Sequence, residues 1–144
     1  MPTRKSSARW EGGLKGGKGT FKGETGAISG QYNFSSRFEE GVGSNPEELL
    51  ATAEAACFSM ALGGGLEVNG TPPTYIDTQA ACTVRPQLEG GFKITEMALT
   101  VSAAVPGIDD AKFQEIVQRT LTGCPVSKAL HGNVDITVSA TLVN

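Results

Sequence analysis

A chain of 144 residues is long enough for one domain with a substantial core and short for two, so we expect a single domain spanning residues 1–144. Apolar residues make up 39% and charged residues 19% of the chain, a balance that is typical of globular proteins and excludes a disordered polyelectrolyte. No uninterrupted apolar run reaches the ~18 residues of a membrane span, and no apolar segment follows the basic N-terminus, so we expect neither a membrane partner nor secretion.

The net charge of −3 is unevenly distributed along the chain. Residues 1–23 carry six Lys or Arg and one Glu, a balance of +5, which leaves −8 for the remainder. A basic arm can indicate nucleic-acid binding. Here, however, the charges are spread through a Gly-rich alternating sequence, which favours solvated strand edges protected by Lys. We therefore expect no nucleic-acid partner.

The first third of the chain predicts an antiparallel meander. Short alternating segments separated by glycines are typical of strands joined by turns, and they lie at residues 7–12, 19–25 and 27–36.

A helix is predicted to follow. Asn45 is a good N-cap, Pro46 suits the first helical position, and Glu48 completes a capping-box pattern. Apolar residues then occur on almost every face, so we expect burial on every face or packing against a second chain. We expect the glycines at 63–65 to weaken or end this helix, and the turn residues at 69–73 to stop it.

Two long strands are predicted at residues 74–84 and 91–105, joined by a hairpin turn. The alternation from Met97 onward is out of phase with Phe92 and Ile94, which predicts a bulge near Thr95–Glu96.

A second amphipathic helix over residues 108–121, a short helix after Cys124 and a strand at 134–143 complete the chain. The order of elements indicates an α+β fold with an antiparallel sheet.

Three cysteines are present, and their odd number and wide spacing indicate a reducing, cytoplasmic compartment rather than a disulfide scaffold. They match no zinc-binding spacing with His131, so we expect no metal and no cofactor. Cys82 lies in a predicted strand and is interpreted as core packing. His131 precedes Gly132 at a helix end and is interpreted as a C-terminal cap rather than a base.

Cys57 lies in the middle of the apolar helix, where burial raises the pKa of a thiol and makes it inert unless a cation compensates. Arg37, flanked by Phe34 and Phe38, is a candidate for that cation, and Glu47 could hold it in a bidentate pair. Glu47 precedes Cys57 by about 15 Å of helix, so it does not reach the thiol itself. Each of these three residues also has a purely structural interpretation. Cys57 could be core packing, Arg37 a surface residue in a loop, and Glu47 a first-turn acid that favours the helix.

Cys124 precedes Pro125 and therefore suits the N-cap of the short helix. Helix N-termini favour reactive thiols, which form mixed disulfides readily. The alternative is that the Cys-Pro pair merely forms a turn.

Two motifs, "NPEELLATAEAACFSMAL" and "GCPVS", together with "ARWEG", "GKGT", "RFEEGVGS", "PTYIDT" and "AVPGID", resemble the OsmC/Ohr family of organic hydroperoxide reductases, most closely its OsmC branch. The resemblance extends over nearly the whole chain. It implies an intertwined homodimer in which the apolar helices pack centrally and both sites lie at the interface. It also implies a thiol-dependent peroxidase that prefers organic hydroperoxides to hydrogen peroxide.

The resemblance implies a role for each site residue. Cys57 would be oxidised to a sulfenic acid and Cys124 would resolve it as a disulfide. Arg37 would activate the thiolate and Glu47 would pair with that arginine. A dithiol such as a lipoylated protein would reset the enzyme. The alternatives are a peroxide sensor or a stress-structural protein on the same fold, with little turnover.

Glu54 departs from the family pattern, in which a His, Tyr or small residue occupies this position. It lies three residues before Cys57, so the two can share a helix face. A carboxylate directed at the thiol would raise the pKa of that thiol and slow its oxidation. We therefore expect Glu54 to point to solvent or to a cation on a partner chain.

Overall fold

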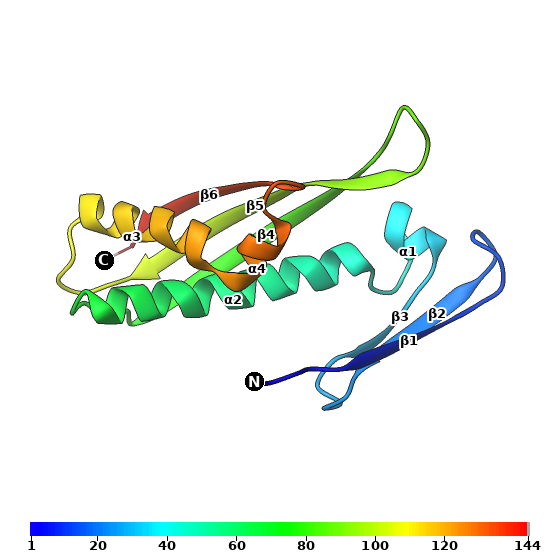
Figure 1. Ribbon diagram of the computed structural model, residues 1–144, viewed down its shortest axis with the longest axis horizontal. Helices are drawn as coiled ribbons and strands as arrows, with labels where there is room; N and C mark the ends of the chain where they lie inside the picture. The colour runs from blue at the N-terminus through cyan, green and yellow to red at the C-terminus, as the bar shows by residue number, and fades with distance from the viewer. Residues whose placement is uncertain (144) are drawn as a thin grey trace. The chain divides into compact units, whose positions relative to one another are not determined.

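A computed structural model describes residues 1–143 of the chain (Figure 1). The chain forms two compact units, one comprising residues 1–49 and the other beginning at Leu50.

The first unit is built on the predicted meander. Its three antiparallel strands pair in chain order, β1 (Ser6–Glu11), β2 (Lys18–Gly23) and β3 (Ser29–Tyr32). Gly19, in the middle strand, pairs with Trp10 on one side and Tyr32 on the other. A Cβ atom at Gly19 would lie 2.6 Å from the Tyr32 ring and 2.8 Å from the Trp10 ring, so glycine is required for the two aromatic rings to cover this strand.

The strand predicted over residues 27–36 ends at Tyr32, and a short helix, α1 (Phe34–Phe38), follows it. Neighbouring residues begin this helix. Asn33 accepts a hydrogen bond from the Ser36 backbone, and the Ser36 side chain accepts one from the Asn33 backbone. This capping box satisfies two donors that a helix end otherwise leaves open.

The long helix α2 (Pro46–Val68) begins where the sequence predicted. The Asn45 side chain accepts a 2.7 Å hydrogen bond from the Glu48 backbone, which confirms the cap. The expectation that the helix weakens or ends at residues 63–65 is wrong, because it continues to Val68. Leu62 and Leu66 are both fully buried on either side of the glycines, so tertiary packing outweighs the glycines' poor helix propensity.

The second unit holds a three-stranded sheet of order β4–β5–β6, made of β4 (Tyr75–Pro86), β5 (Phe92–Ala104) and β6 (Asp135–Leu142). The first two strands form the predicted antiparallel hairpin. The third is parallel to β5, so the expected antiparallel sheet is in fact mixed. A parallel pairing needs a long crossover, and the two helices between β5 and β6 provide it.

The predicted bulge is confirmed. Thr83 pairs with Glu96 while the next residue, Val84, pairs with Ile94, so Thr95 is the additional residue on β5. The bulge shifts the alternation so that Met97 and every second residue after it face the core.

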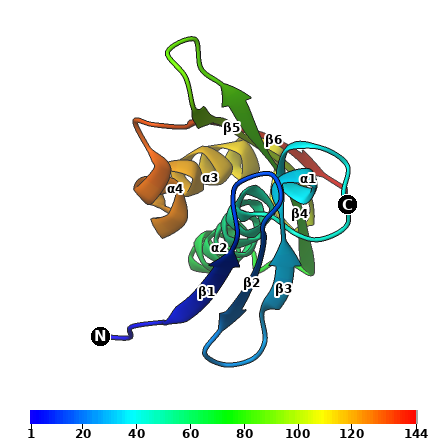
Figure 2. The ribbon, with the colours of Figure 1, turned by 90° about the vertical axis from the view of Figure 1, so that its right-hand side faces the viewer.

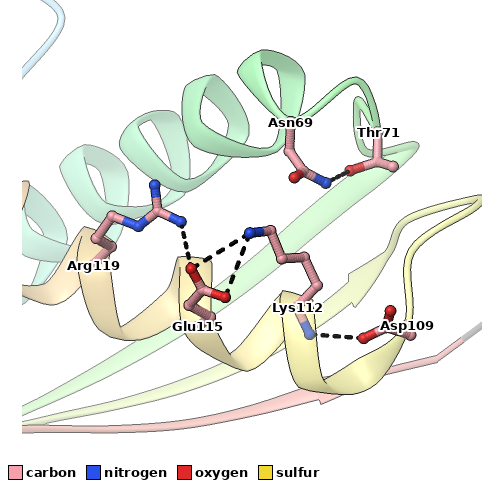
Figure 3. A network of polar contacts seen from close by, with 6 residues as sticks. All are labelled: Asn69, Thr71, Asp109, Lys112, Glu115 and Arg119. Carbon is pink, nitrogen blue, oxygen red and sulfur yellow. Dashed lines mark hydrogen bonds and ion pairs between the residues drawn. The ribbon is translucent and has the colours of Figure 1, made fainter.

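The crossover comprises α3 (Asp110–Gly123) and α4 (Pro125–Leu130). Asp109 caps α3 by accepting a hydrogen bond from the Lys112 backbone, and Glu115 accepts contacts from Lys112 and Arg119 on the exposed face of α3 (Figure 3). Cys124 is the N-cap of α4, as predicted, and it is also the C-cap of α3, which continues to Gly123 instead of ending at the predicted Leu121.

The core of the second unit lies between the sheet and the two longer helices, which cover the same face of the sheet (Figures 1 and 2). Its fully buried members are Phe58, Leu62, Leu66, Met97, Leu99, Val101, Ala103, Val105, Phe113, Ile116 and Val117. Gly65 permits close packing here, since a Cβ atom on it would lie 3.1 Å from Ile116 of α3.

The opposite face of α2 is exposed in the single chain. Met60 and Val68 on this face are 85% and 90% exposed, so the expectation of burial on every face is not met within one chain. By length and composition alone α2 could cross a membrane, but core helices of soluble proteins pass the same test, which makes this weak evidence. The absence of a membrane partner stays a prediction.

Candidate active site

The structure brings Cys57 and Cys124 together from positions 67 residues apart in the chain. Cys57 lies on α2, Cys124 lies at the α3–α4 junction, and their Sγ atoms are 3.0 Å apart. A disulfide bond is about 2.05 Å long, so closing one here requires the sulfurs to approach by about 1 Å. Cys57 is half-buried, whereas Cys124 is fully buried. The pair can therefore form a disulfide in which Cys57 is the less buried residue.

The surroundings of Cys57 raise the pKa of its thiol. Burial is the largest cause, and the hydrogen bond that the Cys57 thiol shares with Cys124 and the negative charge of Glu54 act in the same direction. The backbone of Val126, in the first turn of α4, opposes them with a hydrogen bond to the sulfur. With these neighbours alone the thiol is a weak nucleophile at neutral pH, so an additional cation is needed to activate it.

Glu54 points into the second unit, and the expectation that it faces solvent is wrong. Its side chain is fully buried, and its Oε1 atom accepts a 2.5 Å hydrogen bond from Ser127 Oγ. The same Oε1 lies 3.9 Å from Cys124 Sγ. The carboxyl group therefore contacts the second thiol of the pair.

Arg37 and Glu47 form the predicted pair in the first unit. The Arg37 Nη2 and Nε atoms lie 2.8 Å and 3.2 Å from Glu47 Oε1, and Nε lies 3.3 Å from Oε2. The Glu47 side chain is 7% exposed and that of Arg37 is 35% exposed, so the carboxylate is buried under a guanidinium that keeps one open side. Arg37 also lies over the Phe38 ring, with its Cζ 5.0 Å from the ring centre. These contacts hold the guanidinium in one orientation.

An aromatic cavity of about 230 Å³ lies beside Arg37. Its wall consists of Trp10, Leu14, Tyr32, Asn33, Phe34, Arg37 and Phe38, all within the first unit. An apolar cavity with one cationic wall suits an organic molecule that carries a polar head group.

Cys82 and His131 occupy the structural positions that the sequence predicted. Cys82 is half-buried and packs against the core, as expected. His131 is the C-cap of α4, which confirms that prediction. Sequence reasoning gave no role to Ser127, although it lies three residues after Cys124 in "GCPVS", on the same side of a helical turn. That spacing was the signal that could have linked Ser127 to the thiol.

Comparison with known proteins places this geometry in a family context. Residues 39–139 match the family described as "OsmC-like protein". The chain is 46% identical over 134 residues to the peroxiredoxin OsmC of Escherichia coli, covering 92% of this chain and 93% of that protein. It is 36% identical over 104 residues to an organic hydroperoxide resistance protein of Xanthomonas axonopodis, covering 69% and 68% of the two chains.

Solved structures agree with the fold. The organic hydroperoxide resistance protein OhrB of Bacillus subtilis superposes with a TM-score of 0.77 at 28% identity, covering 96% of this chain and 98% of that one. An OsmC-like protein of Mycoplasma pneumoniae also gives a TM-score of 0.77, covering 99% of each chain, and at 16% identity it supports the fold alone.

Proposed function

The chain belongs to the OsmC-like protein family, and from this membership and its paired thiols we propose that it is a thiol-dependent peroxidase that reduces organic hydroperoxides. The observation that carries the proposal is the 3.0 Å separation of the Cys57 and Cys124 sulfurs. A peroxidase of this kind needs one thiol that peroxide can reach and a second thiol beside it, and the half-buried and buried members of the pair meet these needs.

In the first step, the Cys57 thiolate attacks the distal oxygen of the hydroperoxide. The oxygen–oxygen bond breaks, an alkoxide leaves, and Cys57 becomes a sulfenic acid. Arg37 is the cation that we assign to the thiolate, because Glu47 orients it while one side of its guanidinium stays open. Its positive charge opposes the burial that raises the pKa of Cys57.

In the second step, Cys124 attacks the sulfenic sulfur, water leaves, and the Cys57–Cys124 disulfide closes. A dithiol then reduces this disulfide by exchange and is itself oxidised to a cyclic disulfide. A lipoylated protein is the reductant that we propose, since its two thiols form such a ring. The cycle needs a reducing compartment, which supports a cytoplasmic location.

The likeness to an organic hydroperoxide resistance protein supports a preference for organic hydroperoxides over hydrogen peroxide. An aromatic or alkyl tail gains the burial of apolar surface on binding, at about 25 cal/mol per Å², and hydrogen peroxide has no tail to bury.

The purified protein tests this function directly. With dihydrolipoamide as reductant, we expect sustained consumption of cumene hydroperoxide at a kcat/KM about tenfold or more above that for hydrogen peroxide, as measured by the peroxide remaining over time. Glutathione, a monothiol, serves as the comparison reductant and is expected to support slower turnover. Consumption that stops after one equivalent would instead indicate a peroxide sensor, and no consumption would indicate a structural role.

We also propose that the exposed apolar face of α2 packs against a second copy of the chain in a homodimer. The residues of this face include Ala53, Ala56, Met60 and Val68. A helix face with two large side chains more than four-fifths exposed is better explained by a protein partner than by solvent.

Sedimentation velocity tests the dimer. We expect the wild type to sediment at twice the mass of the chain and Met60→Glu to shift toward the monomer, because the new charge would be buried in the interface. Leu88→Glu is the matched control, since Leu88 is also exposed but lies in the β4–β5 turn. A monomeric wild type would refute the dimer, and an unaffected Met60→Glu would refute the assigned face.

A further inference from the structure

Glu54 is a buried carboxyl group to which the mechanism above gives no role. Its side chain has no exposed surface. Oε1 contacts Ser127 and Cys124, while Oε2 is buried without a hydrogen-bond partner among residues 1–143. Cys124 and Ser127 are themselves 0% and 1% exposed, so the three side chains form a closed polar cluster inside an apolar core.

Packing alone does not explain this cluster. A buried carboxylate loses its hydration, and a cation usually compensates for that loss. In the part of the chain that the structure describes, no Lys or Arg forms an ion pair with Glu54. Serine and glutamate at adjoining buried positions destabilise the core relative to apolar residues of similar volume. A buried carboxyl oxygen without a partner needs an explanation other than packing, and a role in the adjoining thiol chemistry provides one.

Closure of the Cys57–Cys124 disulfide requires a base beside Cys124. Cys124 must lose its proton before it can attack the sulfenic acid, because the thiolate is the nucleophile in such exchanges. Its sulfur has no contact with solvent that could take the proton. Glu54 Oε1, at 3.9 Å within hydrogen-bonding range of a sulfur donor, is an acceptor that the cluster places beside this thiol.

We propose that Glu54 is a further catalytic residue, the base that takes the proton from Cys124 as the disulfide closes and returns it when the disulfide is reduced. This inference rests on the proposed peroxidase function. Ser127 is a positioning residue, because its hydroxyl fixes Oε1 on the side of Cys124.

The Cys124 S–H proton passes to Glu54, and the Cys124 sulfur attacks the Cys57 sulfur as the S–O bond of the sulfenic acid breaks. The departing hydroxide takes a proton from solvent at the half-buried Cys57 and leaves as water. Two electrons from the new thiolate form the disulfide bond, and the proton remains on Glu54 until the disulfide is reduced.

The resetting step reverses this transfer. A thiolate of the reductant attacks Cys57, because this cysteine is the less buried one. The disulfide breaks and Cys124 departs as a thiolate in a site that excludes water. Glu54 returns its proton to that sulfur, which removes the charge and makes Cys124 a better leaving group. The second thiol of the reductant then releases Cys57 by closing the reductant's own disulfide.

A base beside two thiols acts on them in opposite directions. Negative charge on Glu54 raises the pKa of Cys57 and so disfavours the first step. The same charge promotes the second step by receiving the proton of Cys124. Replacing Glu54 by its neutral isostere glutamine should therefore leave the first step unimpaired and slow the second. General destabilisation of the fold would slow both steps.

Single-turnover oxidation of Glu54→Gln tests the inference. The reduced protein is mixed with one equivalent of cumene hydroperoxide and quenched over time with dimedone and N-ethylmaleimide. Peptide mass spectrometry then measures the Cys57 sulfenic acid and the Cys57–Cys124 disulfide separately. We expect sulfenic acid to form at least as fast as in the wild type and the disulfide to form about 100-fold more slowly. The glutamine oxygen can still accept the Ser127 hydrogen bond, so the cluster keeps its shape.

Ser127→Ala is the second variant and decides the matter if Glu54→Gln does not fold. It retains the carboxylate but frees Oε1, so we expect disulfide closure to slow severalfold with sulfenic acid formation unchanged. Closure at the wild-type rate in the folded variant, or equal slowing of both steps, would overturn the role of Glu54. If the wild type itself forms no sulfenic acid, the peroxidase function fails instead, so the two failures are distinguishable.

Discussion

Replacement of Cys57 by serine is expected to reduce the consumption of cumene hydroperoxide to the rate measured without protein. A serine hydroxyl does not ionise near neutral pH and is not oxidised by peroxide, so no sulfenic acid forms and Cys124 has nothing to resolve. The measurement is peroxide remaining under multiple turnover with dihydrolipoamide. Because the lost step is the formation of the covalent intermediate, we expect a loss of at least about 1,000-fold.

Cys82→Ser provides the matched control for this experiment. Cys82 is also half-buried, but it packs against the core from β4, so its removal affects stability rather than the reaction. We expect this variant to keep wild-type turnover while folded. Full activity in Cys57→Ser would show that another thiol receives the peroxide and would refute the assignment of Cys57.

The second large effect is expected from Arg37→Ala. Burial, the hydrogen bond that the Cys57 thiol shares with Cys124 and the charge of Glu54 raise the pKa of Cys57, and we assign to Arg37 the charge that opposes them. Without that charge the pKa rises further, so at neutral pH a smaller fraction of Cys57 is thiolate. Each pKa unit lowers this fraction about tenfold below the pKa, and we expect iodoacetamide alkylation of Cys57 at pH 7 to slow about 10- to 100-fold.

The pH dependence of Cys57 alkylation shows in which direction the loss of Arg37 shifts the pKa of the thiol. The midpoint of the alkylation–pH curve should move to higher pH in Arg37→Ala, and the rates of variant and wild type should converge above both midpoints, where each thiol is fully ionised. Arg85→Ala is the matched control, because Arg85 also pairs with a glutamate, Glu96, but in an exposed pair on the β4–β5 hairpin. An unchanged midpoint in Arg37→Ala would show that Arg37 does not act on the thiol.

Features governed by neighbouring residues were predictable from the sequence. The N-cap at Asn45, the bulge at Thr95 and the turn into a short helix at Cys124 all depend on hydrogen bonds and steric preferences within a few residues. The Arg37–Glu47 pair was also predictable, because an arginine ten residues before a first-turn glutamate can form a bidentate ion pair with it. The α1 helix also had a local signal in its N-cap Asn33, although the residue pattern over 27–36 favoured a strand instead.

Features that depend on distant residues were not predictable in the same way. Helix propensity argued for a break at residues 63–65, yet Leu62 and Leu66 keep the helix intact by packing in the core. The parallel pairing of β6 arises from the crossover through α3 and α4, which no periodicity within the strand records.

The sequence by itself therefore determined most of the secondary structure, the α+β class and, through motifs at Cys57 and Cys124, the family. Only the tertiary structure decided that these sulfurs lie 3.0 Å apart and that Glu54 turns inward to Ser127. The physical reason is that the surroundings of a side chain on an apolar helix depend on what packs against each face. The residue that contacts Glu54, Ser127, lies on α4 about 70 residues away along the chain, and no local pattern around Glu54 predicts that contact.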